Sequence, residues 1–317
     1  MKTIISEQEI SRANLEAVAR QAKIDRQRAT MGRRFNNILT VILYFVIAFI
    51  FVAPLMWVLG NSFRSSQSIW ANVYPISWKT FIPFDEFSFY NYAEALGLTT
   101  VGQGLGLDLS RALFISLASA ITVVIFSLIF NTGAAYFFAR LKFPGKKYLL
   151  VYVIATMMIP QQVVIVPLFL VVQQLGLINT FWALVVPWYA SPFIVFALSQ
   201  FFADLPYELD EAATMDGANL LQILLHVVIP NSLPGLLTVS LLEFQFIWNE
   251  FYWPLVAISA KNLVPVQVAI ASQFTESDPQ WGRVFAAMVL ASLPVILLFV
   301  FLQRYYYESA AMSGVKG

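Results

Sequence analysis

The sequence contains no cysteine, one histidine and few charged residues. Without cysteine there is neither a disulfide framework nor a thiolate metal site, and a single histidine excludes most zinc chemistry. Charged residues make up 12% of the 317 positions, about half of the roughly 25% that is usual in a soluble domain. The formal net charge of +1 provides no basic surface for nucleic acid. These absences indicate a membrane protein.

Apolar residues make up 59% of the chain and are concentrated in long runs. A membrane-spanning helix needs about twenty of them in succession. Residues 1–36 are hydrophilic and lack the apolar core of a signal peptide, so we expect a cytoplasmic tail there and a transmembrane domain over residues 37–317. The fold class predicted is an all-α polytopic membrane protein with six spans: Ile38–Gly60, Ala112–Phe138, Tyr148–Val172, Phe181–Phe202, Leu233–Leu255 and Val284–Leu302.

The distribution of lysine and arginine predicts the orientation of these spans. Six spans place both ends of the chain on one side of the membrane. If that side is the cytoplasm, the inner segments hold fourteen lysines and arginines and the outer segments hold five. This bias favours the N-in, C-in topology. The loop between the fourth and fifth spans then lies in the cytoplasm, although it has no lysine or arginine.

That loop, Leu205–Pro234, is the most strongly patterned polar segment of the chain. Pro206 suits the first turn of a helix, and three acidic residues follow it near the positive end of the helix dipole. Gly217 can close this helix in a left-handed conformation, and a capping box can start a second helix, which Pro230 and Pro234 are expected to end. The segment therefore predicts two short helices joined by a tight bend. The acids are Glu208, Asp210 and Glu211, and the capping box is Asn219 with Gln222.

The fifth span carries acidic residues within an apolar run. Glu243 lies about 15 Å from its cytoplasmic end, at 1.5 Å per residue. A charge near the bilayer centre costs about 2.5–3.5 kcal/mol on insertion scales, so we expect Glu243 to face a translocation pathway or a neighbouring subunit. On a continuous helix, Glu250 shares its face, and Asn249 is adjacent. The nearby Trp248, Tyr252 and Trp253 are interpreted as an interfacial aromatic belt.

Prolines interrupt the third and fourth spans. Each proline frees a backbone carbonyl that neighbours, water or a cavity must satisfy. Gln161 and Gln162 directly follow Pro160. Kinked helices with polar side chains fit a transport pathway, but they also occur as plain packing features. The other interrupting prolines are Pro167, Pro187 and Pro192.

The polar loop contains a motif in two parts. The first is Glu211-Ala212-Ala213-Thr214-Met215-Asp216-Gly217-Ala218, and the second is Val227-Val228-Ile229-Pro230. Together they resemble the EAA motif of binding-protein-dependent ABC importer permeases, E-A-A-x-x-D-G-A followed by I-x-L-P. The resemblance extends over about residues 112–317.

Three further stretches resemble the carbohydrate (maltose-type) subgroup of that family. Gly176–Thr180 is similar to its G-L-x-N-T turn, and Trp248–Leu255 to its W-N-x-F-x-x-P-L stretch. The ending Ser313–Gly317 is similar to its G-[AG]-V-K-G terminus. The resemblance implies contact of Val315, Lys316 and Gly317 with an ATPase.

The family resemblance implies a multi-subunit importer in the cytoplasmic (inner) membrane. Its EAA segment would be a cytoplasmic coupling helix in a cleft of an ABC ATPase dimer. The chain has no G-x-x-x-x-G-K-[ST] loop, so ATP and Mg would be used by that partner, and this chain would be neither an enzyme nor a cofactor binder. Further implied partners are a second, non-identical permease, a solute-binding protein and membrane lipid.

Other functions stay open at this stage. The solute could be a polyol or glycerol phosphate instead of a sugar. An intramembrane enzyme using Glu243 and Glu250 is disfavoured because seven helical residues separate them by about 10 Å. An ion-coupled secondary transporter would show internal symmetry between its halves, which this sequence does not show.

Overall fold

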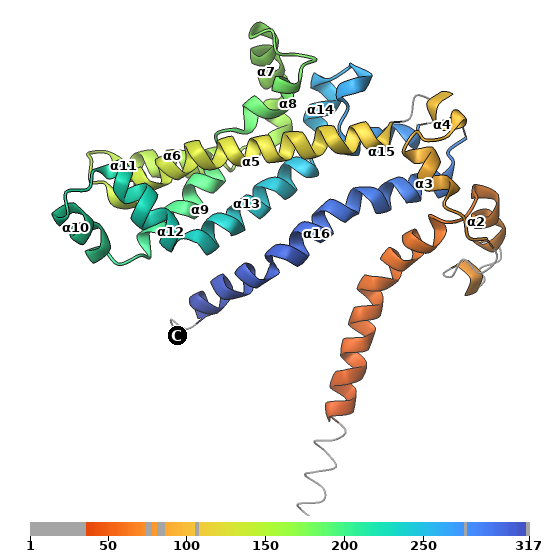
Figure 1. Cartoon of the computed structure of the whole chain (residues 1–317), viewed down its shortest axis with the longest axis horizontal. Coiled ribbons are helices and arrows are strands. Elements are labelled where there is room, and N and C mark those ends of the chain that lie inside the picture. The colour runs from red at the N-terminus through yellow and green to blue at the C-terminus, as the bar shows by residue number, and fades with distance from the viewer. Residues whose placement is uncertain (1–35, 74–77, 81–85, 105–107, 276–277, 315–317) are drawn as a thin grey trace, which may run out of the picture. The chain divides into compact units, whose positions relative to one another are not determined.

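The computed structural model describes residues 36–73, 78–80, 86–104, 108–275 and 278–314, and every regular element within these ranges is helical (Figure 1). The chain divides into two compact units, Met1–Trp57 and Val58–Gly317. A first helix covers Asn36–Asn61. The elements after it are α2 (Ser66–Val73), η1 (Trp78–Thr80), α3 (Tyr90–Ala95), α4 (Thr100–Gly104), α5 (Leu109–Arg140), α6 (Lys146–Thr156), α7 (Gln161–Gln174), α8 (Phe181–Val185), η2 (Val186–Trp188), α9 (Pro192–Ala203), α10 (Glu208–Met215), α11 (Leu220–Ile223), η3 (Leu224–Val228), α12 (Ile229–Asn231), α13 (Leu233–Trp248), α14 (Tyr252–Ala257), η4 (Lys261–Leu263), α15 (Val266–Gln273) and α16 (Trp281–Gly314).

The first helix, Asn36–Asn61, is apolar on all of its sides. It has 26 residues, which corresponds to about 39 Å at 1.5 Å per residue. A helix that is hydrophobic all round needs apolar surroundings on every face, and a bilayer supplies them. The described residues of the first unit, 36–57, therefore belong to a membrane span.

Three helices are long and apolar enough to cross a membrane unbroken, namely Asn36–Asn61, α5 and α16. Three further spans are pairs of helices with a bend between them. The bend is 98° between α6 and α7, 43° between Phe181–Trp188 and α9, and 83° between Leu220–Asn231 and α13. When each bent pair is counted as one span, the total is six, which confirms the predicted number.

Proline explains where two of the pairs break. Pro160 directly precedes α7, and Pro192 is the first residue of α9. Since proline has no N–H and its ring clashes with the carbonyl four residues earlier, a helix does not run smoothly into it. The second helix of the polar segment runs through Pro230 and ends at Asn231, between the two prolines that were expected to end it. The preceding residues, Leu224–Val228, form a wider π-helical turn, which makes room for the ring.

The fifth span is not one helix to Leu255, as the sequence suggested. Its helix α13 ends at Trp248, and α14 begins at Tyr252. A Glu250 carboxylate oxygen accepts a hydrogen bond of 3.0 Å from the Trp253 N–H and so caps the new helix. Glu243 and Glu250 therefore do not share a face of one helix. The prediction of one continuous helix was wrong because an apolar run has the same composition whether it forms one helix or two.

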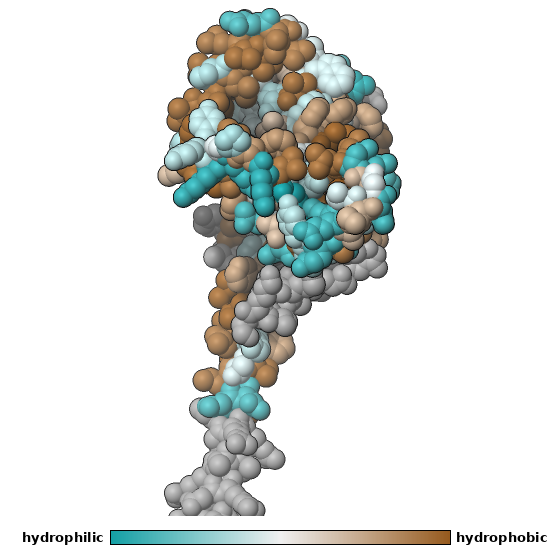
Figure 2. Space-filling model, turned by 90° about the vertical axis from the view of Figure 1, so that its left-hand side faces the viewer, coloured by the Kyte–Doolittle hydropathy of each residue, from teal (hydrophilic) through white to brown (hydrophobic). Residues whose placement is uncertain are grey.

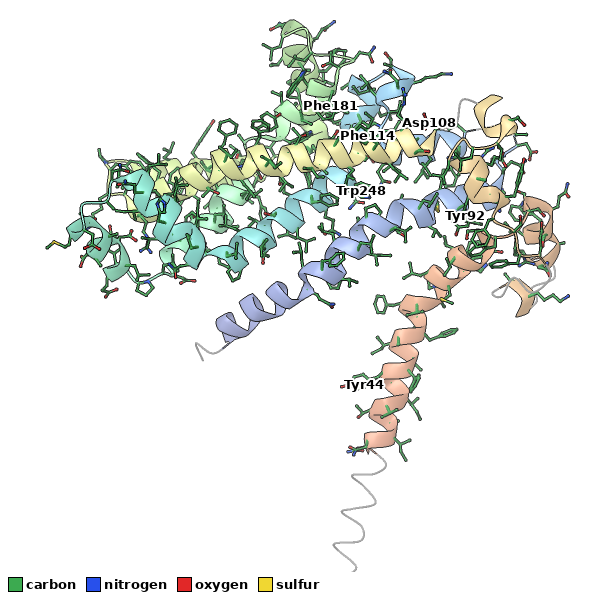
Figure 3. The ribbon with its side chains drawn as sticks, in the orientation of Figure 1. Tyr44, Tyr92, Asp108, Phe114, Phe181 and Trp248 are labelled. Carbon is green, nitrogen blue, oxygen red and sulfur yellow. The ribbon has the colours of Figure 1, made fainter. Side chains whose placement is uncertain are left out.

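α5 is the central helix of the second unit (Figure 1). It lies along α9 and α13, and α15 meets its first half. One apolar cluster surrounds the half that begins at Leu109 and includes Trp253, and another surrounds the half that ends at Arg140 and includes Phe202. Trp248 joins α13 to α16, because its ring N–H donates to the Ala291 carbonyl at 3.1 Å (Figure 3).

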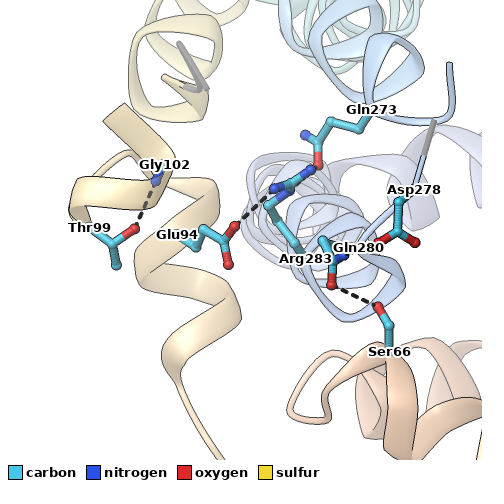
Figure 4. Close-up of polar contacts among 8 residues, drawn as sticks. All are labelled: Ser66, Glu94, Thr99, Gly102, Gln273, Asp278, Gln280 and Arg283. Carbon is cyan, nitrogen blue, oxygen red and sulfur yellow. Dashed lines mark hydrogen bonds and ion pairs between the residues drawn. The ribbon is translucent and has the colours of Figure 1, made fainter. Parts of the chain in front are cut away.

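A buried polar cluster fastens α16 to the helices that precede α5. The Arg283 side chain is 0% exposed and pairs with Glu94 of α3 at 2.9 Å. Its Nε also donates to Gln273 of α15 at 3.3 Å (Figure 4). A Cβ at Gly282 would collide with the backbone carbonyl of Arg64 and the side-chain amide of Asn91. Glycine therefore allows the backbones to approach closely enough for the ion pair to form.

We expect Gly282→Ala to lower thermal stability by roughly 1–3 kcal/mol, the usual cost of overpacking a close contact. Gly133→Ala is the matched control, because it also lies in a helix but a Cβ there would meet nothing within 4 Å. It should be neutral or stabilise the protein by up to about 1 kcal/mol through helix propensity. Thermal unfolding of both variants in detergent measures the difference. Equal melting temperatures would contradict the close-contact argument.

Candidate functional site

The polar segment after the fourth span forms the predicted bent pair of helices. α10 begins at Glu208, two residues after Pro206, which precedes the first turn and does not lie in it. The three predicted acids lie in that turn. Gly217 has a φ of +86° and ends the helix in the left-handed region. Both hydrogen bonds of the capping box between Asn219 and Gln222 are present, at 2.8 and 3.0 Å.

The motif residues divide between an exposed and a packed side. Ala213 and Ala218 pack against the Phe202 cluster, and Pro230 lies in α12. Seen from this end of the molecule, hydrophilic side chains gather among apolar ones (Figure 2). The segment thus presents an exposed surface that includes the Glu211 and Asp216 carboxylates. The exposed members are Glu211, Ala212, Thr214, Met215, Asp216, Gly217 and Pro230.

α10 is attached to the end of α5 by a buried ion pair. Arg140 Nε lies 3.4 Å from Asp210 Oδ2, and the two side chains are 3% and 11% exposed. The Arg140 guanidinium also lies over the Tyr207 ring at 5.3 Å, and the Tyr207 hydroxyl donates to the Arg140 carbonyl at 3.0 Å. These contacts join the start of α10 to the last residue of the central helix. The sequence did not reveal this pair. The signal available was a basic residue at the end of one helix, Arg140, and an acidic residue at the start of another, Asp210.

Asp210→Asn should destabilise the protein by about 3–5 kcal/mol, because it leaves the Arg140 guanidinium buried without its opposite charge. We expect faster proteolytic cleavage around α10 and a lower melting temperature. Asp216→Asn is the control, since it removes the same charge from an exposed position of the same segment. If the two variants were cleaved and melted alike, the ion pair would not hold α10.

A cavity of about 520 Å³ lies where the third and fourth spans break. Glu243 of α13 is 5% exposed and lies in its wall, together with Gln161 at the start of α7. Thr156 and Ser191, which lie beside the two breaks, are further polar residues of the lining. This arrangement fits a membrane protein, in which irregular backbone is tolerated where it lines a cavity. The lining residues are Thr156, Met157, Gln161, Pro187, Trp188, Ala190, Ser191, Pro192, Phe193, Leu242, Glu243 and Phe246.

Three other predicted pathway residues lie outside this lining. Glu250 is hydrogen-bonded to Gln161, whose Nε2 donates to Glu250 Oε2 at 2.9 Å. Glu250 therefore holds the side chain of a cavity-lining residue without lining the cavity itself. Gln162 and Asn249 are exposed and do not line the cavity. The structure thus brings together Gln161, Glu243 and, indirectly, Glu250.

The aromatic residues near the cavity differ from the predicted belt. Trp248 and Trp253 are 2% and 0% exposed and belong to the core, while Tyr252 is 55% exposed. The rings in the cavity wall are instead Trp188, Phe193 and Phe246, and the centroids of Trp188 and Phe246 are 5.4 Å apart in an edge-to-face arrangement. These rings give the cavity an apolar part beside its carboxyl and amide groups.

Two predicted regions lie outside the described residues. They are most of the proposed tail, residues 1–35, and the proposed ATPase contact at Val315, Lys316 and Gly317.

The chain is similar to transporter permeases in sequence and in structure. The family described as "Binding-protein-dependent transport system inner membrane component" matches residues 131–310. The arabinooligosaccharides transport system permease protein AraQ of Halalkalibacterium halodurans is 28% identical over 90% of this chain and 100% of its own length. The diacetylchitobiose uptake system permease protein NgcG of Streptomyces coelicolor is 30% identical over 89% of both chains.

A crystal structure shares the fold. It is that of a bacterial ABC transporter involved in the import of the acidic polysaccharide alginate. The TM-score is 0.72 at 23% identity, and the match covers 86% of this chain and 97% of the other.

Proposed function

Because the chain belongs to the binding-protein-dependent transport system inner membrane component family, we propose that it is the permease subunit of an ATP-driven importer for a neutral sugar or oligosaccharide. It is a multi-pass protein of the cytoplasmic (inner) membrane and a transport component, not an enzyme. The observation that carries the coupling role is the geometry of α10. The helix presents Glu211 and Ala212 outward while Asp210 is clamped to Arg140 of α5.

α10 is the coupling helix that enters a groove of the ATPase partner. Ala212 allows close approach of the backbones, and the Glu211 carboxylate pairs with a basic residue that sets the register. Gly217 lets the chain turn sharply away from the groove. The partner's ATPase dimer binds ATP and Mg and performs the hydrolysis, and this chain binds no cofactor. Force on α10 then reaches α5 through the Arg140–Asp210 pair.

The cavity at the helix breaks is the proposed sugar pathway. Its volume of about 520 Å³ falls within the 300–1,000 Å³ that is typical of small-molecule sites. The carboxyl and amide groups of Glu243 and Gln161 suit hydroxyl groups, and the Trp188 and Phe246 rings suit the apolar face of a sugar. The described lining contains an acidic but no basic residue, which favours a neutral sugar over an acidic one.

The importer needs further subunits. A second, non-identical permease completes the pathway, and an extracytoplasmic solute-binding protein delivers the sugar. AraQ and NgcG carry the names of arabinooligosaccharide and diacetylchitobiose systems, which supports an oligosaccharide as the cargo. Membrane lipid surrounds the apolar helix Asn36–Asn61.

The test is uptake by liposomes that contain the purified complex. We expect ATP-dependent uptake of an arabino-oligosaccharide or of diacetylchitobiose, and little uptake of an alginate oligosaccharide. Glu243→Gln should reduce uptake about tenfold or more, since a hydrogen bond to a charged group contributes roughly 1.5–3 kcal/mol. Ser240→Ala, on the same helix but outside the cavity lining, should transport normally.

Two results would overturn this proposal. Uptake driven by an ion gradient without any ATPase would exclude an ATP-driven importer. Preferred uptake of the acidic sugar, unchanged in Glu243→Gln, would exclude the proposed pathway.

Glu211→Ala should leave membrane insertion intact but weaken ATPase binding by about 2 kcal/mol or more, because it removes one partner of an interfacial charge pair. Gly217→Val should act in the same direction, since valine is strained at a φ of +86°. Pull-down of the ATPase on the membrane-inserted variants measures the effect. Glu208→Ala removes an exposed charge from the same turn, outside the Glu-Ala-Ala run. If Glu208→Ala weakened ATPase binding as much as Glu211→Ala does, the loss would come from the lower negative charge of the turn and not from a specific contact of Glu211.

A further inference from the structure

The fourth span contains a break that needs an explanation of its own. Between η2 and α9 the backbone leaves the helical path at Tyr189–Ser191, with a bend of 43° between the helices. Pro192 follows and has no N–H to offer. Within a bilayer, each backbone N–H and C=O freed by such a break must find a partner inside the protein.

One side chain of the central helix satisfies both sides of this break. Asn131 of α5 is 2% exposed. Its Nδ2 donates to the Tyr189 carbonyl at 3.1 Å, and its Oδ1 accepts from the Ser191 N–H at 3.0 Å. The same amide nitrogen lies 2.7 Å from both the Ser127 carbonyl and the Ser127 hydroxyl, which holds the side chain in place.

The chemistry of these bonds explains why the residue is asparagine. At the break the Tyr189 carbonyl is an acceptor and the Ser191 N–H is a donor, and a carboxamide offers a partner to each from two separate atoms. Leucine has a similar size but offers neither, and aspartate offers only the acceptor. The Tyr189 ring stacks on Phe126 of α5 at 4.8 Å, so the broken segment lies against the same helix by apolar contact as well.

The break lines the cavity and is tied to α5, whose end is joined to α10 by the Arg140–Asp210 ion pair. Ala190, Ser191 and Pro192 all line the cavity. Nine residues after Asn131, about 14 Å along the helix, α5 ends at Arg140. Displacement of α5 therefore acts on the break through Asn131 and on α10 through Asp210.

We propose that Asn131 is a positioning residue that holds the broken fourth span in the shape that forms the cavity and links this shape to the movement of α5. The first part concerns this chain alone. The second part rests on the proposed function, because it needs an ATPase that moves α10.

The first experiment measures hydrogen–deuterium exchange of the segment around Ser191, with the full chain in lipid nanodiscs. Asn131→Leu should speed exchange of the Ser191 amide at least about fivefold, since its hydrogen bond is lost. Asn131→Asp keeps the acceptor and should leave this amide protected. Ser119→Ala is the control, because Ser119 is a buried hydroxyl of α5 with no hydrogen-bond partner among the described residues. Unchanged exchange in Asn131→Leu would overturn the proposal.

A second measurement tests the cavity itself. The chain has no cysteine, so Ala190→Cys introduces a single thiol in the cavity wall. We expect a charged, water-soluble thiol reagent to label it at least about fivefold more slowly when Asn131→Leu is added, while Ser119→Ala leaves the rate unchanged. Equal rates would show that the cavity keeps its shape without Asn131. If Asn131→Leu lost labelling because the whole protein unfolded, as seen in thermal melts, this result would also count against a local positioning role for Asn131.

The third measurement separates this proposal from the proposed function. In the assembled transporter, Asn131→Leu should retain ATPase binding and ATP hydrolysis but transport less sugar per ATP. A variant that lost uptake and hydrolysis in proportion would contradict the link to α5. If the unmodified complex transported no sugar at all, the proposed function would fail, whereas the exchange and labelling results would still decide the role of Asn131.

Discussion

The structure depends on one constraint, which is that a bilayer offers no hydrogen-bond partner to a backbone N–H or C=O. Three spans of this chain are nevertheless bent pairs of helices, and the fifth span is also interrupted between α13 and α14. Residues near three of these interruptions satisfy freed backbone groups or make room for a proline. Asn131 bonds the freed groups of the fourth span. Glu250 caps the helix that follows α13, and a π-helical turn accommodates Pro230. Because breaks expose polar backbone, they are also where a polar pathway can form, and the cavity lies beside two of them.

α5 connects the features on which transport would depend. It is unbroken over 32 residues, so it can move as a rigid rod, unlike the bent spans around it. Its end is joined to the exposed coupling segment by a buried ion pair, and its middle is joined to the cavity wall by Asn131. Neither contact contributes much net stability by itself, since burying charged and polar groups costs solvation energy. Their geometry instead joins both the cavity wall and α10 to α5, so that a movement of α5 would reach both.

Local patterns predicted a substantial part of this molecule. The number of spans followed from runs of apolar residues, because about twenty are needed to cross the bilayer. The bent helix pair followed from Gly217 and the capping box of Asn219, since both act on groups within a few residues along the chain. Family resemblance identified the coupling motif from eight consecutive residues. By contrast, the continuous fifth helix was wrong, because composition does not reveal a capping interaction such as that of Glu250.

The sequence by itself therefore determined the membrane class, the number of spans and the bent helix pair after the fourth span, all of which depend on short-range order or on total hydrophobicity. Only the tertiary structure decided which polar residues meet. Arg140 and Asp210, Gln161 and Glu250, and Asn131 and Ser191 are each separated by 60 or more positions. Each residue has an unremarkable position in its own segment. Their pairing arises from the packing of α5 against the broken spans, which no local pattern records.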